Sequence, residues 1–207
     1  VGPVLARKLA TMGITRLGQL QVLTDRDAAR RLGDDGPALV RRARGEDVRL
    51  VDPARETKSI SAETTFDTDL REVVALERHL WRLAEKLARR LRENDLAAAG
   101  VVLKLKTAQF SIRTRAARLP SPTMLPDRVF SAAHDLLLRE ATGTAFRLIG
   151  IGASPLVPRE EADRGDLADA ETPRLAAAQA AIDALRERYG ATAIGRGRGF
   201  GGGKRER

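Results

Sequence analysis

The sequence predicts an α+β protein, in which a small all-helical unit precedes a domain with the element order β-α-β-β-α-β. Four short segments with helical spacing of apolar residues fill the first fifty residues, and two longer amphipathic segments follow at about 69–93 and 126–140. Four segments predict strands, at 58–66, 100–110, 112–119 and 145–151. This order suits a four-stranded antiparallel sheet with both helices on one side.

The opening unit consists of short helices with clear start and stop signals. Pro3 suits the first turn of a helix, because its missing N–H is not needed there, and Gly13 ends that helix. Thr24 is expected to cap the third helix, and Gly45 to end the fourth. The expected helices span residues 3–12, 16–23, 25–32 and 37–44.

Shifts in composition predict how the rest of the chain is organised. Residues 1–50 form the helical unit, 51–57 a linker, and 58–156 the α+β domain. Beyond them we expect a flexible acidic link at 157–172, a helix at 173–194, and a disordered basic Gly/Arg tail at 195–207. One face of that last helix carries an apolar stripe of Leu175, Ala178, Ile182, Leu185 and Tyr189, so the helix is expected either to pack on another domain or to remain loosely attached.

Composition narrows the classes of function. The 207 residues include no cysteine, which fits a reducing interior, and no run of about 18 apolar residues, so we expect a cytoplasmic protein without a membrane partner. The net charge of +9 favours a polyanionic partner. The chain starts at Val1 inside a motif, without an initiator methionine, which we interpret as a fragment.

The positive charge gathers in residues 96–119, which contain no acid. Their five cations are Lys104, Lys106, Arg113, Arg115 and Arg118. In the second strand, Val101, Leu103 and Leu105 point one way and the two lysines the other. In the third, Ile112, Thr114 and Ala116 are expected to point to the core, and Arg113 and Arg115 away from it.

The first strand adds hydroxyl groups to the same uncovered face. Ile60, Ala62, Thr64 and Phe66 share one face, while Ser59, Ser61, Glu63 and Thr65 share the other. A surface of hydroxyls and cations suits phosphate oxygens. The alternative is that these cations only keep an edge strand from aggregating.

A second phosphate site is predicted at the start of the chain. In VGPVLARKL, Gly2 precedes a helix whose first amides have no partner within the helix, and Arg7 and Lys8 supply charge nearby. The alternative is a plain helical turn that contains a glycine.

These stretches together resemble a known family. VGPVLARKLATMGITRLGQL is similar to the helix-hairpin-helix of the thumb in Y-family translesion DNA polymerases of the DNA polymerase IV type, and LGDDGPALVRRARGEDVRLVDP to the passage that follows it. The little-finger domain of that family resembles KSISAETTF, VVLKLKTAQFSIRTRAARLPSPT and FRLIGIGAS, in order and spacing. The resemblance covers about residues 1–156.

The resemblance implies a grip on primer-template double-stranded DNA. The thumb hairpin holds the primer side near the minor groove, and the little finger holds backbone phosphates against the major groove. By this match Gly2 and Val4 contribute hairpin amides. Contacts to the DNA backbone are expected from Lys58, Ser59, Ser61, Arg113, Thr114 and Arg115, in addition to Lys8, Lys104 and Lys106. Family members often carry a basic residue before the lysine of the first strand, whereas this chain has Thr57.

Catalysis is expected to lie outside this chain. Nucleotidyl transfer needs clustered carboxylates that hold two divalent metals. The family places them, with Mg²⁺, in a palm domain that precedes the thumb, so metal-binding carboxylates should lie upstream of Val1. Asp67 and Asp69 are expected to cap the helix that follows them. His79 and His134 have no second ligand at metal spacing, so packing or surface roles are expected. We therefore expect no catalytic residue and no metal site.

The family often carries a sliding-clamp peptide, Q-L-D-L-F, after the little finger. The corresponding positions are Arg164, Gly165, Asp166, Leu167 and Ala168, of which only the aspartate and leucine remain. Loss of the polar anchor and the aromatic plug predicts weak or no clamp binding. Cations of the C-terminal tail are expected to add salt-sensitive attraction to DNA. We expect a monomer.

Two other functions fit the element order. An RNA-binding module would carry aromatic side chains on its exposed strands, and Phe110 is the only aromatic residue in the two central segments. A structural adaptor for an acidic protein would bind neither nucleic acid.

Overall fold

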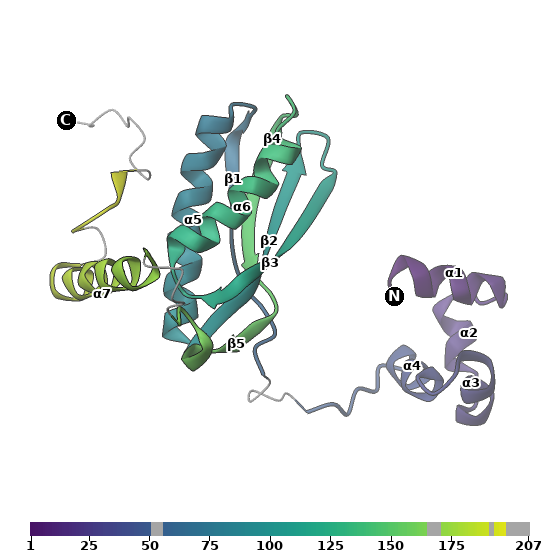
Figure 1. The fold of residues 1–207 in the computed structure, drawn as a ribbon. Helices are drawn as coiled ribbons and strands as arrows, with labels where there is room; N and C mark the ends of the chain where they lie inside the picture. The colour runs from purple at the N-terminus through teal and green to yellow at the C-terminus, as the bar shows by residue number, and fades with distance from the viewer. Residues whose placement is uncertain (51–55, 165–170, 191–192, 198–207) are drawn as a thin grey trace. The chain divides into compact units, whose positions relative to one another are not determined.

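A computed structural model describes residues 1–50, 56–164, 171–190 and 193–197 (Figure 1). The chain divides into two compact units, Val1–Arg55 and Glu56–Arg207. Part of the predicted linker, most of the predicted clamp peptide and most of the basic tail lie outside the described residues.

The N-terminal unit consists of four short helices, as predicted. They are α1 (Pro3–Thr11), α2 (Leu17–Gln21), α3 (Asp25–Leu32) and α4 (Gly36–Ala43). The Thr24 hydroxyl accepts a hydrogen bond from the Asp27 backbone N–H at 3.1 Å, which confirms the predicted cap of α3. Gly36 allows α3 and α4 to approach closely, because a Cβ atom there would lie 2.2 Å from the Ala28 carbonyl oxygen. Leu9, Ile14, Leu20, Leu32 and Ala43 form the core of this unit.

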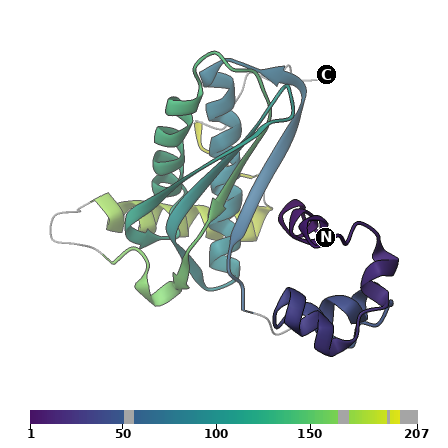
Figure 2. The same ribbon diagram turned by 90° about the vertical axis from the view of Figure 1, so that its right-hand side faces the viewer.

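The C-terminal unit has the predicted order β-α-β-β-α-β. Its elements are β1 (Ile60–Leu70), α5 (Val73–Glu93), β2 (Leu96–Thr107), β3 (Ile112–Thr123), α6 (Pro126–Glu140) and β4 (Phe146–Ala153). The strands are antiparallel in the order β1-β4-β2-β3, and a short strand β5 (Leu156–Pro158) also pairs with β2. A 3₁₀ turn, η1 (Arg159–Glu161), follows β5. Figure 2 shows the strands as one twisted layer.

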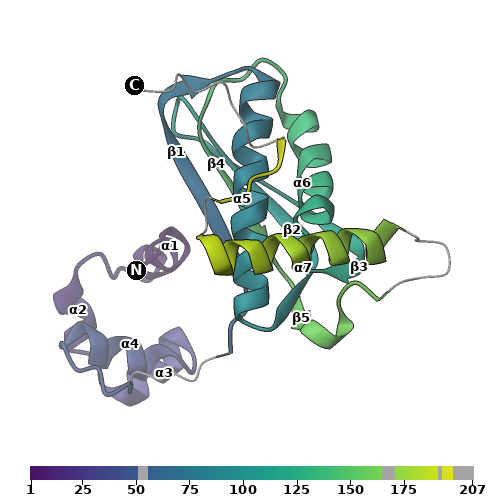
Figure 3. The same ribbon diagram turned by 90° about the vertical axis from the view of Figure 1, so that its left-hand side faces the viewer.

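Helices α5 and α6 cover one face of this sheet (Figures 1 and 3). The predicted stripe of α5 is confirmed, because Leu76, Leu80, Leu83 and Leu87 are buried in one cluster with Val101, Leu103 and Leu105 of β2. Burying each such side chain stabilises the fold by about 1.5–3 kcal/mol. The face of the sheet that α5 and α6 leave uncovered is called the open face below.

One predicted helix cap is wrong. Asp67 and Asp69 lie within β1, which continues to Leu70, and α5 begins at Val73 with Glu72 as its N-cap residue. The strand is longer than its alternating pattern suggested, because Leu70 still pairs with Phe146 of β4 after an irregularity in the ladder. The two aspartates are therefore exposed strand residues.

Helix α7 (Glu171–Tyr189) crosses the outer side of α5 and α6 (Figure 3). It docks through polar groups, because Asp183 pairs with Arg92 of α5 at 2.8 Å and Arg186 pairs with Glu85 at 3.0 Å. Within the apolar stripe of this helix, Leu185 and Tyr189 are exposed and Leu175 and Ile182 are half-buried, whereas Thr172 and Gln179 are buried.

The first cation of the predicted tail also rests on this helix layer. The Arg196 guanidinium contacts the Asp127 carboxylate, donates to Gln179 Oε1 at 3.0 Å and lies over the Trp81 ring. None of the helices in the described ranges is long and apolar enough to cross a membrane.

Candidate nucleic-acid interface

The open face is organised in rows, because partners in an antiparallel ladder point to the same side. In the central row, Thr114 of β3 lies opposite Lys104 of β2, Lys104 opposite Gly150 of β4, and Gly150 opposite Glu63 of β1. A Cβ atom at position 150 would lie 2.9 Å from the Glu63 Cβ. Glycine therefore leaves a flat strip in the middle of the open face.

One acid reaches across this flat strip. The Lys104 Nζ lies 2.8 Å from Glu63 Oε2, although the two residues lie on strands separated by β4. Both side chains are substantially exposed, at 40% and 51%, so the pair contributes little stability. The pair instead changes the charge of the open face, because Glu63 partly neutralises Lys104, one of the two lysines predicted to bind phosphate.

The predicted orientation of Arg113 and Arg115 is wrong. Arg113 lies opposite Leu105 and Arg115 opposite Leu103, and both leucines belong to the core. The two arginines therefore point to the helix side of the sheet, while Ile112, Thr114 and Ala116 lie on the open face. Ile112 is 59% exposed there.

A carboxylate on α6 explains why two arginines are tolerated on the helix side. Glu140, whose side chain is only 10% exposed, lies 3.3 Å from Arg113 Nη1 and 2.7 Å from Arg115 Nε. A nearly buried carboxylate is costly unless cations and hydrogen bonds compensate it. Two guanidinium groups share one carboxylate, so the cluster keeps a net positive charge.

These lysines and arginines nevertheless lie on two neighbouring strands, β2 and β3, at one edge of the sheet. Strand β3 lies at the end of the strand order and pairs with β2 alone in the described part of the chain. Lys104 and Lys106 lie on the open face opposite Thr114 and Ile112 of β3, although the Lys104 ammonium points away from β3 toward Glu63 of β1, and Arg113 and Arg115 lie on the other face. Arg118, farther along β3, is exposed. These five cations are called the β3 rim below.

The predicted residues of the first strand lie at the opposite edge. Lys58 and Ser59 precede β1 and are exposed, and Ser61 is exposed on the open face opposite Gly152. Because β1 and β3 end the strand order, the structure separates these residues from the β3 rim by the width of the sheet.

The start of α1 provides exposed backbone amides for a phosphate, but little free positive charge. Gly2 is the N-cap residue of α1 in an extended conformation, and no atom lies within 4 Å of a Cβ built on it. Val4 is 74% exposed in the first helical turn. Lys8, by contrast, donates to the Leu32 carbonyl at 3.5 Å, so its side chain already has a partner within the unit.

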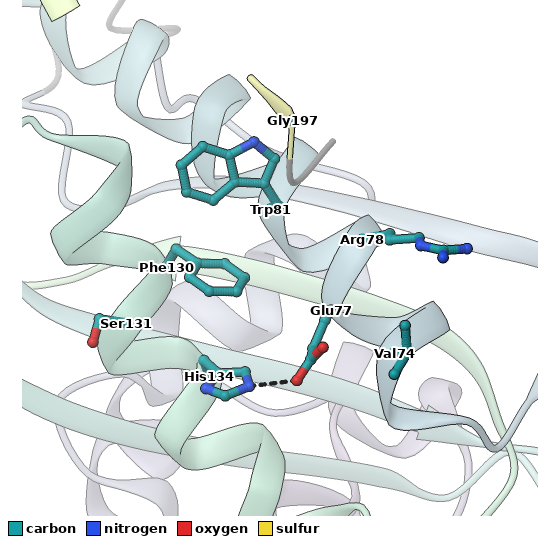
Figure 4. A pocket seen from close by; sticks show the side chains of 8 residues that line it. All are labelled: Val74, Glu77, Arg78, Trp81, Phe130, Ser131, His134 and Gly197. Carbon is teal, nitrogen blue, oxygen red and sulfur yellow. Dashed lines mark hydrogen bonds and ion pairs between the residues drawn. The ribbon is translucent and has the colours of Figure 1, made fainter. Parts of the chain in front are cut away.

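A pocket of about 580 Å³ lies on the helix layer, between α5 and α6 (Figure 4). Trp81 and Phe130 form its aromatic wall, and His134 Nε2 lies 2.6 Å from Glu77 Oε1. The other histidine, His79, packs against Phe66, with 4.7 Å between the ring centroids. Both histidines thus pack against aromatic rings, one of the two roles expected for them. Within the described ranges, no group of three histidine or acidic residues could hold a metal ion.

The sequence prediction missed two residues of this region. Glu140 orients the arginines of β3, and Arg147 of β4 lies over the ring of Phe110, with its Cζ 4.1 Å from the ring centroid. The only signal for Glu140 was an acid at the end of an amphipathic helix. Arg147 gave the signal of a cation inside an otherwise apolar strand.

Comparisons with known proteins agree with this architecture. Residues 57–167 match the impB/mucB/samB family C-terminal domain. The chain is 47% identical over 204 residues to DNA polymerase IV 1 of Mesorhizobium japonicum, covering 99% of this chain and 47% of the relative. It is 44% identical over 200 residues to DNA polymerase IV of Brucella melitensis, covering 97% of this chain and 45% of the relative. It thus spans about half the length of these relatives.

A solved structure shows the same fold. A Y-family DNA polymerase chimera, Dbh-Dpo4(243-245)-Dbh, matches with a TM-score of 0.50 and 18% sequence identity, covering 76% of this chain and 46% of the chimera.

Proposed function

We propose, since this chain belongs to the Y-family DNA polymerases of the DNA polymerase IV type and comprises their C-terminal region, that it holds primer-template DNA by the sugar-phosphate backbone during lesion bypass and DNA repair. The observation that carries the proposal is the β3 rim, where three arginines of an uncovered edge strand and two lysines of its neighbour β2 lie beside an open sheet face. Cations and free backbone groups at such an edge suit a strand of phosphates.

The charges of the rim are held in place before DNA arrives. Glu140 fixes both guanidinium groups at the strand edge, so less side-chain freedom is lost when a phosphate binds. Because phosphates are the same in every sequence, the grip carries little sequence preference. A polymerase that copies damaged templates needs this property, since the bases it passes are altered.

The open face and the N-terminal unit extend the proposed grip. Hydroxyls of Ser61 and Thr114 are exposed on the open face, and Lys58 lies at its far edge. First-turn amides of α1, near Gly2 and Val4, suit a separate phosphate. Lys8 is a weaker candidate than the sequence suggested, because its ammonium already binds a carbonyl.

The chemistry of nucleotide addition is proposed to belong to the rest of the polymerase. The described residues do not fit a two-metal site, because they include no cluster of three metal-ligating side chains. We therefore propose that this chain alone binds DNA without extending a primer, and that Mg²⁺ acts in the parent enzyme at carboxylates elsewhere.

The salt dependence of duplex binding tests the rim. The variant should replace Arg113, Arg115 and Glu140 together by Gln, because removal of the arginines alone would leave a nearly buried carboxylate without a partner. We expect weaker binding to duplexes of every sequence. The slope of log K against log salt should become shallower by about one unit for each phosphate that the variant no longer neutralises.

Two controls isolate the effect. Glu140→Gln alone keeps both cations and is expected to keep most of the slope. The combined change of Arg78, Lys86 and Glu187 to Gln alters three exposed side chains on the helix layer with the same change in net charge, and should leave the slope unchanged. An unchanged slope in the β3 variant, or an equal loss in the helix-layer variant, would contradict the proposed grip.

A further inference from the structure

The turn between β2 and β3 carries an aromatic side chain that the core does not use. Phe110 is 60% exposed, and Ile112, the first residue of β3, is 59% exposed. Two cations lie over the Phe110 ring: Lys106 Nζ is 4.7 Å from its centroid and Arg147 Cζ is 4.1 Å from it. These four residues are called the tip cluster below.

A β-bulge brings Arg147 to this cluster. Lys106 of β2 pairs with Leu148 of β4, but the next residue, Thr107, pairs with Phe146, so Arg147 is an extra residue in β4. A bulge of this kind turns one side chain away from the regular alternation, and bulges are frequent beside functional sites. The Ala108 N–H donates to the Ala145 carbonyl at 3.0 Å, which ties the turn to the start of β4.

The backbone of Phe110 is also unusual. Its φ of 65° lies in the left-handed region, where the Cβ of a non-glycine residue costs about 1–2 kcal/mol. The turn is nevertheless closed, because the Phe110 N–H donates to the Thr107 carbonyl and the Thr107 N–H to the Ser111 carbonyl, each at 2.9 Å. The fold thus holds a large apolar ring in solvent in a conformation that glycine would adopt more readily.

The chemistry of the tip cluster suits a nucleotide that is not base-paired. Aromatic rings stack on any base, and neighbouring cations bind the phosphates on either side of it. Inside a duplex the faces of a base are already stacked on its neighbours, so an exposed ring finds no free base face there. Two cations beside the ring disfavour a purely apolar partner.

We propose that the tip cluster binds an unpaired nucleotide of the single-stranded DNA that continues from the duplex held by the β3 rim. Phe110 stacks on the base, Lys106 and Arg147 contact the flanking phosphates, and Ile112 supports the edge of the stacked base. This inference rests on the proposed DNA grip, since Lys106 belongs to both the rim and the tip cluster. It adds a preference for the junction between double-stranded and single-stranded DNA.

Three DNAs of one sequence test this inference by fluorescence anisotropy with the 207-residue chain. The first is a blunt duplex, the second carries a four-nucleotide single-stranded overhang, and the third carries the same overhang with abasic sites. We expect the overhang DNA to bind about tenfold more tightly than the blunt duplex, since one stacked base gives a preference of that order. The abasic overhang should lose most of this gain, because it keeps phosphates but lacks bases.

Variants then assign the preference to Phe110. Phe110→Ala should lose the preference for the overhang and bind the blunt duplex like the wild type, while Phe110→Trp should keep it. Leu138→Ala, which shortens a 49% exposed side chain on α6, is the matched control and should change neither affinity. Thermal unfolding of each variant checks that it is folded.

The outcomes separate the two proposals. If the blunt duplex binds with the expected salt dependence but Phe110→Ala keeps the overhang preference, or the abasic overhang binds as tightly as the normal one, the tip inference is wrong and the rim survives. A wild type without any overhang preference also overturns the inference. Failure of the chain to bind any of the three DNAs overturns the proposed grip itself.

Discussion

At the scale of single residues, the alternation of side chains was predictable but the register was not. Faces were assigned correctly for Ser61 of β1 and Lys104 of β2 and reversed for Arg113 and Arg115 of β3. The error has a physical cause. Apolar Ile112 was expected in the core, whereas the ladder places it opposite Lys106 on the open face. A nearly buried acid from α6, distant in sequence, compensates the arginines that take the inner side.

His79 gives a prediction at this scale. Burial, and to a lesser extent the nearby Arg82, lowers the pKa of His79 below its ordinary 6.5. Between the lowered value and 6.5 the unfolded chain binds more protons than the folded one, so stability rises with pH across that window. The contribution is fully present above pH 6.5 and is lost as pH falls through the folded pKa.

Urea unfolding at pH 7.5 and pH 5.0 measures this effect. The wild type is expected to lose more stability on acidification than His79→Gln, because the variant lacks the partly buried His79 imidazole that must take up a proton. Titration of the imidazole signals by NMR, with His134→Gln used for assignment, should give His79 a pKa below 6.5. A value at or above 6.5, or equal losses in both proteins, would refute the prediction.

At the scale of elements, the type and order of helices and strands were largely predictable, because apolar periodicity and helix signals are local. The four helices of the first unit and the β-α-β-β-α-β order follow from such signals. Less predictable features depend on pairing: β1 continues past Phe66 because β4 pairs with it, and β5 exists through its ladder with β2. The docked face of α7 was missed because it is polar.

Helix α7 is expected to be held by its ion pairs. Burial lowers the pKa of the Arg92 guanidinium, while Asp183 beside it acts in the opposite direction. Asp183→Asn should therefore weaken docking, because a half-buried guanidinium loses its carboxylate partner. Hydrogen exchange of the α7 amides should become about tenfold faster, which corresponds to about 1.4 kcal/mol of local stability.

A second variant in the same hydrogen-exchange experiment serves as the control for removing a carboxylate from α7. Glu187→Gln changes an exposed carboxylate of α7 that faces solvent, and should leave α7 exchange at the wild-type rate. Amides of β2 and β4 should exchange alike in all three proteins. Equal exchange of α7 in wild type and Asp183→Asn would show that the ion pair does not hold the helix.

At the scale of the whole molecule, charge and family resemblance predict a polyanionic partner, but they do not predict the surface that would contact it. The net charge of +9 is a property of composition, whereas the β3 rim depends on strand order and on Glu140. Of the predicted residues, Lys58 lies just before β1 and Arg113 in β3, the two strands that end the strand order. A duplex that contacts both must therefore extend across the width of the sheet to the β3 edge.

A titration of the isotopically labelled chain with a duplex of arbitrary sequence, followed by NMR, tests this account most directly. We predict that the backbone amides of β2 and β3 and the guanidinium signals of Arg113 and Arg115 shift first and most strongly, with smaller changes near Lys58. The amide signals of α5, α6 and α7 should not shift. Shifts concentrated on those helices, with the β3 rim unaffected, would contradict the claim that DNA is held at this edge.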